Sequence, residues 1–161
     1  MLYVKARAGR SQIHGLGLIA QEFIPKGTRV WAFEPSFDLA FTAEQLEALS
    51  TAAREQVLWY AYYDPVHHVY VLSGDDDRFT NHSDQPNTAD ESLWTYGASY
   101  AVRDIRAGEE LTWDYRPWSG SDFLKHAAAH IGVPATGSYL SQAGAEQERS
   151  TNIFAESANV E

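Results

Sequence analysis

The chain has 161 residues, a net charge of −10 at pH 7 and no cysteine. A single domain of this length can bury a core without metal or disulfide support. The lack of cysteine excludes disulfides, thiolate metal sites and a cysteine nucleophile. The acidic charge argues against direct binding of nucleic acid, which uses basic surface to displace counterions, and it favours a basic partner.

The first forty residues predict short strands separated by turns. We expect a strand at 2–6, ended by the sequence of residues 8–11, and another at 28–33. Between them, Gly15 and Gly17 stand at the edge of an apolar run. Glycine there permits a positive φ or a close approach of the backbone to another group, and the simpler alternative is a β-bulge.

One inserted helix is predicted at about residues 42–63. Thr42 and Gln45 form a capping box, and Phe41 can pack on Leu46 as a hydrophobic staple. Apolar residues then recur at helical spacing, namely Leu46, Leu49, Ala53, Val57 and Tyr60. For the aromatic end of this helix, residues 59–63, we expect packing in the core, with the lining of a groove as the alternative.

Further strands are predicted at 69–72, 95–103 and 111–115. The turn formed by Asp75, Asp76 and Asp77 is expected to be solvated, because it lacks the glycine and the distal glutamate of an EF-hand loop. With short strands, turns and one inserted helix, the chain reads as a mainly β fold of several small sheets.

The last part of the chain predicts a short helix that begins at Ser121. On that helix His126 and His130 could share a metal, but no third ligand is evident, and we predict no metal site. Residues 134–161 are small, polar and acidic, and we expect them to form a flexible tail.

The first residues lack the pattern of a signal peptide, and the sequence contains no apolar run of about 18 residues. We therefore expect no membrane association. The expected location is the cytoplasm, or the nucleus if the source is eukaryotic.

The sequence Arg78-Phe79-Thr80-Asn81-His82-Ser83-Asp84-Gln85-Pro86-Asn87 is too polar for a core strand. Its asparagine, aspartate and serine side chains can bond nearby backbone, and proline fixes its own φ. A stiff polar segment of this kind is typical of a binding site. No nucleophile elbow, P-loop or His-Glu-x-x-His sequence accompanies it, and Gly15-Leu16-Gly17 lacks the third glycine of a dinucleotide fingerprint.

Three motifs in this order resemble the SET-domain protein lysine methyltransferases. His14-Gly15-Leu16-Gly17-Leu18 is similar to the first SET motif. Residues 81–87 resemble the Asn-His-Ser-Cys-x-Pro-Asn motif, and residues 108–115 resemble the Gly-Glu-Glu-Leu-Thr-aromatic-Asp-Tyr motif. The resemblance covers about residues 8–118.

The resemblance implies the SET β-clip fold, with several small curled sheets, a pseudoknot and one inserted helix. We expect a single, small stand-alone SET domain at 1–133 and the tail at 134–161. The implied activity is transfer of a methyl group from S-adenosyl-L-methionine to a lysine side-chain amine in a protein or peptide. A basic substrate, such as a histone or a ribosomal protein, would suit the acidic surface, and the oligomeric state stays open.

The resemblance also implies the residues of the site. Tyr115 is the predicted catalytic residue, and Trp113 and Tyr100 are expected to line the substrate channel. The residues expected to bind the cofactor are Gly15, Leu16, Gly17, Arg78, Asn81, His82, Tyr115 and Trp118.

The chain departs from the family pattern at several positions. Asp84 replaces the usual cysteine, and the cysteine-rich segment of many members is missing, so we expect Trp118 or Phe123 to cover the adenine. Residues 33–35 replace a Tyr-x-Gly sequence. Trp113 stands where members carry phenylalanine or tyrosine, which leaves the number of transferred methyl groups open.

These departures leave two alternatives to a protein lysine methyltransferase. One is a catalytically silent SET module that binds a peptide or the cofactor, and the other is a methyltransferase that acts on a small amine.

Overall fold

The computed structural model of the chain describes residues 1–90 and 97–116. The predicted helix from Ser121, the His126 and His130 pair, and the tail at 134–161 lie outside these residues. So do Trp118 and Phe123, the two candidates for a cover over the adenine.

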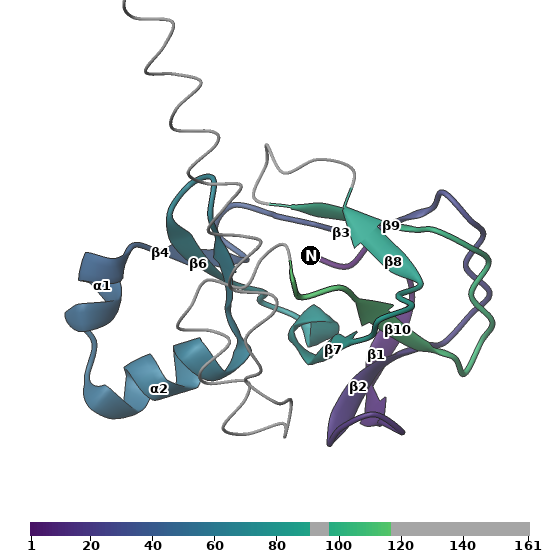
Figure 1. Cartoon of the computed structure of the whole chain (residues 1–161), viewed down its shortest axis with the longest axis horizontal. Helices are drawn as coiled ribbons and strands as arrows, with labels where there is room; N and C mark the ends of the chain where they lie inside the picture. The colour runs from purple at the N-terminus through teal and green to yellow at the C-terminus, as the bar shows by residue number, and fades with distance from the viewer. Residues whose placement is uncertain (91–96, 117–161) are drawn as a thin grey trace, which may run out of the picture.

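The strands of the described structure form three small sheets, whose arrangement Figure 1 shows. The first has the strand order β1-β2-β10-β7, the second β3-β9-β8 and the third β4-β6-β5. The strands are β1 (Ala6–Arg10), β2 (Leu16–Ala20), β3 (Arg29–Ala32), β4 (Leu39–Phe41), β5 (Tyr62–Asp64), β6 (Val69–Leu72), β7 (Asn81–His82), β8 (Thr88–Asp90), β9 (Ala98–Ala101) and β10 (Glu110–Trp113). The mainly β fold predicted from the sequence is therefore confirmed.

The prediction for the first strand was wrong in its position. Leu2 forms only an isolated bridge with Trp31, and the strand β1 occupies Ala6–Arg10, where the sequence predicted a break. The chain stays extended there because β1 pairs antiparallel with β2, with Gly9 opposite Gly17. Hydrogen bonds to β2 satisfy the backbone groups of β1. The turn residues at 8–11 give no sign of this distant partner, so the prediction placed a break there.

The inserted segment contains two helices in place of the single predicted helix. Helix α1 (Ala43–Glu47) begins with the expected capping box: the Gln45 backbone N–H donates to Thr42 Oγ1 (3.2 Å), and the Thr42 N–H donates to Gln45 Oε1 (2.8 Å). Helix α2 (Thr51–Tyr60) begins anew after Ser50, whose side chain accepts from the Ala53 N–H (3.3 Å). The Ser50 cap therefore divides a segment whose apolar spacing alone predicts one continuous helix.

The helical segment ends earlier than predicted because Tyr62–Asp64 pairs with β6 as strand β5. Both helices lie on one side of the molecule in Figure 1, beside β4 and β6. Within the described residues, neither helix has the length and apolar character needed to cross a membrane.

Two clusters of apolar side chains form the interior. The smaller one lies under the helices and contains Leu46, Val57 and Ala61, with Phe41 packed against it, as the predicted staple requires. The larger one joins the sheets, and its buried members are Ala6, Leu18, Ala20, Ile24, Val30, Trp31, Val69, Val71, Ala101, Ile105 and Leu111.

Strand β10 lies between β2 and β7. It pairs antiparallel with β2, where Leu111 faces Leu18, and parallel with β7, where Trp113 faces His82. Three segments that are far apart in the sequence, and that carry the three motifs, therefore lie side by side. The strand order thus brings the three motifs together, as the family resemblance implies.

Candidate functional site

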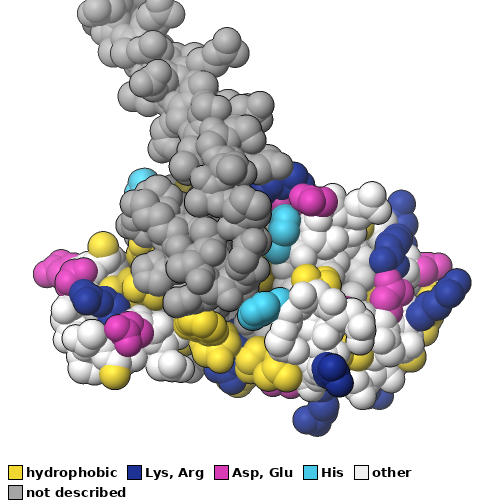
Figure 2. Space-filling model, turned by 60° about the horizontal axis from the view of Figure 1, so that its bottom comes forward, with side chains coloured by type: hydrophobic (Ala, Val, Ile, Leu, Met, Phe, Trp, Pro, Cys, Tyr) yellow, Lys and Arg dark blue, Asp and Glu magenta, His cyan; other side chains and the backbone are white. Residues whose placement is uncertain are grey.

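The candidate site is a cavity of about 420 Å³ where the three motifs meet. This volume falls within the range of roughly 300–1,000 Å³ that is usual for small-molecule sites. Seven of the predicted site residues line it: Gly15, Leu16, Arg78, Asn81, His82, Trp113 and Tyr115. In Figure 2, histidine side chains lie next to hydrophobic ones on the face presented.

Asn81 holds the start of β2 and the segment before it at the cavity wall. Its side-chain Nδ2 lies 2.9 Å from the Leu16 carbonyl oxygen and 3.2 Å from that of His14. The same nitrogen lies 2.8 Å from Glu110 Oε1 and 3.1 Å from Ser11 Oγ. The Asn81 amide thus holds the first motif beside the second. It also bonds the Glu110 carboxylate, which belongs to the third motif.

The two glycines of the first motif have different roles. Gly15 lines the cavity and has a φ of 48°, a conformation that favours glycine. Gly17 does not line the cavity, and a Cβ atom added there would lie 2.2 Å from Glu110 Oε1. The structure therefore gives Gly17 the task of making room for Glu110, where we had expected a contact with the cofactor.

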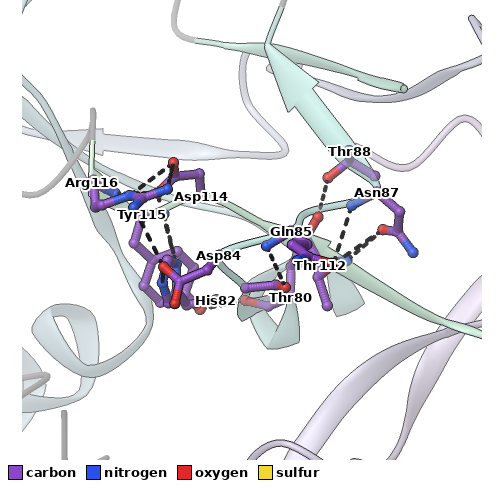
Figure 3. Close-up of polar contacts among 11 residues, drawn as sticks. Thr80, His82, Asp84, Gln85, Asn87, Thr88, Thr112, Asp114, Tyr115 and Arg116 are labelled. Atoms are coloured by element: carbon purple, nitrogen blue, oxygen red, sulfur yellow. Dashed lines mark hydrogen bonds and ion pairs between the residues drawn. The ribbon is translucent and has the colours of Figure 1, made fainter. Parts of the chain in front are cut away.

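His82 and Tyr115 meet on the wall of the cavity (Figure 3). The Tyr115 backbone N–H donates to His82 Nδ1 (3.2 Å), and the two ring centroids are 5.4 Å apart. At its other end, the Tyr115 hydroxyl donates to the carbonyl oxygen of Thr80. Tyr115 is thus held from both ends by the segment of the second motif.

The Tyr115 hydroxyl stays protonated at neutral pH. Burial, followed by the negative charges of Asp77 and Glu110, raises its pKa above the ordinary value near 10. A tyrosine hydroxyl that donates its proton to a carbonyl can also accept a hydrogen bond at its oxygen. Tyr115 can therefore orient a donor in the cavity, but it is no base at neutral pH.

Asp84 stands at the position of the family cysteine. Its carboxylate lies close to the side chains of Arg116 and His82 (Figure 3). Its Oδ1 lies 3.4 Å from Arg116 Nη1 and 3.5 Å from His82 Nε2. Arg116 also contacts Asp114 at 2.6 Å, and although burial opposes it, hydrogen bonds from Arg116 hold the pKa of Asp114 below its ordinary value. Because the Asp84 side chain is 80% exposed, its ion pair contributes at most about 1 kcal/mol.

Aromatic rings form a second wall of the cavity. Trp113 makes edge contacts with Tyr62 (5.5 Å between centroids) and Tyr115 (6.0 Å), and Tyr62 in turn contacts Trp31 (6.4 Å). Burial raises the pKa of Tyr62 well above its ordinary value. A charged amine that enters between these rings loses most of its hydration.

Tyr100, which we had expected in the substrate channel, is not brought to the cavity. Its hydroxyl accepts from Arg29 Nε (3.2 Å), and the guanidinium lies 5.7 Å from the centre of its ring. Its neighbour Ser99 lines the cavity instead. Successive side chains of a strand point to opposite faces, and the sequence does not tell which face of β9 looks inward.

The aromatic end of α2 lines the cavity, so the expectation of core packing was wrong for Trp59 and Tyr60. Their residues are 49% and 36% exposed, and both contribute to the cavity wall with Leu58 and Tyr62. The groove-lining alternative, weighed for this aromatic run, identifies them correctly.

The expectation of a solvated turn at the three aspartates was also wrong. Asp75 Oδ2 accepts from the Leu2 N–H (2.6 Å), and Asp76 Oδ2 accepts from the Ala8 N–H (3.0 Å). They tie the 3-10 helix η1 (Asp76–Phe79) to the N-terminal segment, while Asp77 lines the cavity. Sequence reasoning missed Asp77, because only the folded chain shows that this carboxyl group is enclosed.

The residues present suit S-adenosyl-L-methionine, the cofactor implied by the motifs. Gly15 and Leu16 line the cavity, Asn81 and His82 supply polar groups, and aromatic rings supply apolar surface. Within residues 1–90 and 97–116, no three histidine or acidic side chains are grouped so that they could hold a metal ion.

Comparison with known proteins agrees with this geometry. Residues 15–116 match the SET domain family. The chain is 31% identical over 134 residues to a putative histone-lysine N-methyltransferase 1 of Plasmodium falciparum, an alignment that covers 71% of this chain and 2% of that protein. It is 33% identical over 113 residues to the histone-lysine N-methyltransferase set-2 of Caenorhabditis elegans, covering 66% of this chain and 7% of that protein. The chain thus spans a small part of the length of these relatives.

Solved structures show the same fold at lower identity. A putative histone methyltransferase of Plasmodium falciparum superposes with a TM-score of 0.51 and 22% identity, covering 71% of this chain and 95% of that one. The Polycomb Repressive Complex 2 of Chaetomium thermophilum, bound to GSK126, gives a TM-score of 0.56 and 21% identity over 78% of this chain and 17% of that one. The match of residues 15–116 shows that the chain belongs to the SET domain family, as its three motifs predicted.

Proposed function

We propose that the chain is a protein-lysine N-methyltransferase that uses S-adenosyl-L-methionine. The observation that carries this proposal is the junction of Asn81, His82 and Tyr115 at one cavity with an aromatic wall. The names of the relatives, which are histone-lysine methyltransferases, support the same activity.

When bound, S-adenosyl-L-methionine supplies a methyl group activated by a sulfonium charge. The residues that would hold it are Gly15 and Leu16 through their backbone, Asn81 and His82 through polar groups, and Arg78 at the rim. Transfer of the methyl group to an amine that is already neutral depends mainly on correct placement and removal of water.

The aromatic wall would help to make the substrate reactive. A lysine amine with a pKa near 10.4 costs roughly 4–5 kcal/mol to hold neutral at pH 7. Burial among Trp113, Tyr62 and Trp31 favours the neutral form and lowers that pKa.

Tyr115 would then orient the neutral amine. Its own proton is directed to the Thr80 carbonyl, so its oxygen accepts a hydrogen bond from an N–H of the amine. This contact would aim the nitrogen lone pair at the cofactor side of the cavity, where the first and second motifs lie.

The proposed substrate is a lysine in a basic protein segment. A net charge of −10 favours encounter with a basic partner, and the relatives point to histones as the first proteins to test. This charge disfavours direct contact with nucleic acid.

The decisive experiment is methyl transfer from labelled S-adenosyl-L-methionine to core histones by the unchanged chain and by Tyr115→Phe. We expect the variant to lose at least about a hundredfold in kcat, as when one positioned hydrogen-bonding group is removed. Calorimetry should show cofactor affinity within about twofold of the unchanged chain, because the cofactor contacts lie mainly on the first two motifs.

Tyr63→Phe is the matched control. Tyr63 is a partly exposed tyrosine outside the cavity, and its hydroxyl contacts His68 Nδ1 at 3.0 Å. It should leave the rate unchanged. Full activity in Tyr115→Phe would remove Tyr115 from the chemistry. Failure of the unchanged chain to bind the cofactor would contradict the proposed activity and favour a silent module that binds a peptide.

A further inference from the structure

We propose that Asp77 accepts the proton which the substrate ammonium must lose before methyl transfer. The inference rests on the proposed function and adds to it a residue that none of the three motifs contains. Asp77 lies in η1, directly before the second motif, and it lines the same cavity as Tyr115, Tyr62 and Trp113.

The position of Asp77 connects it with the catalytic tyrosine. Thr80 Oγ1 lies 3.4 Å from Asp77 Oδ1, and the Thr80 carbonyl accepts the hydroxyl proton of Tyr115. The charge of Asp77 acts on both Tyr115 and Tyr62, since it raises the pKa of each. The carboxyl group therefore lies at the end of the cavity where the amine is to be held.

The side chains of the neighbouring aspartates, Asp75 and Asp76, bond the backbone of the N-terminal segment, whereas the side chain of Asp77 does not. Asp75 and Asp76 accept hydrogen bonds of 2.6 Å and 3.0 Å from backbone N–H groups of the N-terminal segment. The Asp77 carboxyl group has the long contact with Thr80, and the hydrogen bond to Asp75 uses its backbone N–H. Its side chain is thus available to the cavity.

The surroundings of Asp77 suit a base that works near neutral pH. Burial has the largest effect and the charge of Asp75 the next, and together they raise its pKa to about 7. Asp38 acts in the same direction, while the N-terminal ammonium and the Thr80 hydroxyl oppose the rise. A general base is most effective when its pKa lies close to the working pH.

The proposed step is a single proton transfer. One N–H bond of the lysine ammonium breaks, an O–H bond forms on the Asp77 carboxylate, and the nitrogen keeps the electron pair. The ammonium and carboxylate become a neutral amine and a neutral carboxylic acid, a pair that a dry aromatic cavity favours over two charges. The carboxylic acid then releases its proton to water.

The test uses Asp77→Asn, which keeps the size and one acceptor oxygen but cannot take up a proton. With core histones as substrate, kcat at pH 7.5 should fall about a hundredfold, with KM and the cofactor Kd within about twofold. The unchanged chain should show a rise of kcat through pH 7 that the variant lacks. A peptide with aminoethylcysteine in place of lysine, whose amine is more acidic, should restore part of the lost rate.

Asp76→Asn is the matched control, because Asp76 is the adjacent residue of η1 and does not line the cavity. It should keep the rate and the pH profile. Equal losses in both variants would show that Asp77 only supports the helix, and would overturn the inference.

A second measurement does not depend on turnover. Carbon-13 NMR of chain labelled at aspartate carboxyl groups, with Asp77→Asn for assignment, should show the Asp77 signal titrating near pH 7. Titration near pH 4 would overturn the inference, as would a normal pH profile in Asp77→Asn. Failure of the unchanged chain to bind cofactor or transfer methyl would instead contradict the proposed function, and the Asp77 titration would still be read separately.

Discussion

Asn87 and Thr112 hold the second and third motifs together through a reciprocal pair of hydrogen bonds (Figure 3). The Thr112 backbone N–H donates to Asn87 Oδ1 (2.8 Å), and the Asn87 N–H donates to Thr112 Oγ1 (3.2 Å). Asn87 Nδ2 also donates to the Glu110 carbonyl (2.8 Å). The final asparagine of the second motif thus acts as an extra backbone partner for β10, and it touches no part of the cavity.

Asn87→Ala should therefore lower the stability of the fold without directly lowering the rate of methyl transfer. Asn87 is only 1% exposed, so its removal leaves a buried N–H and a buried carbonyl without partners. We expect a loss of about 2–4 kcal/mol in the free energy of unfolding, measured by urea denaturation. Gln85→Ala, on the exposed part of the same loop, should change it by less than about 0.5 kcal/mol. Equal stability of both variants would contradict the role given to Asn87.

Gly17→Ala tests the close approach between Gly17 and Glu110. The added methyl would lie 2.2 Å from Glu110 Oε1, so the carboxylate must move and release Asn81. We expect a loss of about 1–3 kcal/mol in stability and weaker cofactor binding by calorimetry. In a Glu110→Ala background the same change should cost clearly less, because the clashing atom is gone. Additive losses in this double-mutant cycle would argue against the contact.

The motifs made much of the site predictable. Each runs without gaps along the sequence, and the structure brings Gly15, Asn81, His82 and Tyr115 to the same cavity. The capping box at Thr42 was predictable for the same reason, since the residues that interact are only three positions apart.

The errors arose where distant neighbours decide the structure. The enclosure of Asp77 depends on the fold, which places η1 at the cavity beside Tyr62, Trp113 and Tyr115. Ser99 faces the cavity and Tyr100 faces Arg29 because of the register between β3 and β9, which residue patterns alone do not determine. Tyr62 joined a strand because β6 was available as its partner.

Trp113→Phe should change the methylation state of the product. The indole of Trp113 lies against both Tyr62 and Tyr115, and a smaller ring would leave more room beside the amine. We expect a larger share of di- and trimethylated lysine, measured by mass spectrometry of the modified histones. Trp59→Phe, at the exposed rim of the cavity, is the control and should keep the product distribution. A shift toward monomethylation in Trp113→Phe would show that the indole does not limit the space.

The pH dependence of stability should report the burial of Asp77. Its pKa is about 7 in the folded chain and 3.8 ordinarily, so between these values the folded state holds a proton that the unfolded state has released. The contribution of Asp77 to stability therefore falls as pH rises from about 4 to 7, by up to about 4 kcal/mol, and levels off above 7.

Asp77→Asn cannot titrate and should lack this decline. Urea denaturation at pH 4.5, 6 and 8 should show the variant gaining stability relative to the unchanged chain as pH rises, with the largest advantage at pH 8. Asp104→Asn is the control, because Asp104 lies on the surface, where its Oδ1 accepts from the Lys26 N–H (2.9 Å). Its stability curve should run parallel to that of the unchanged chain. A parallel curve for Asp77→Asn as well would mean that this carboxyl group is solvated, and the cavity would then lack the enclosed acid that distinguishes it.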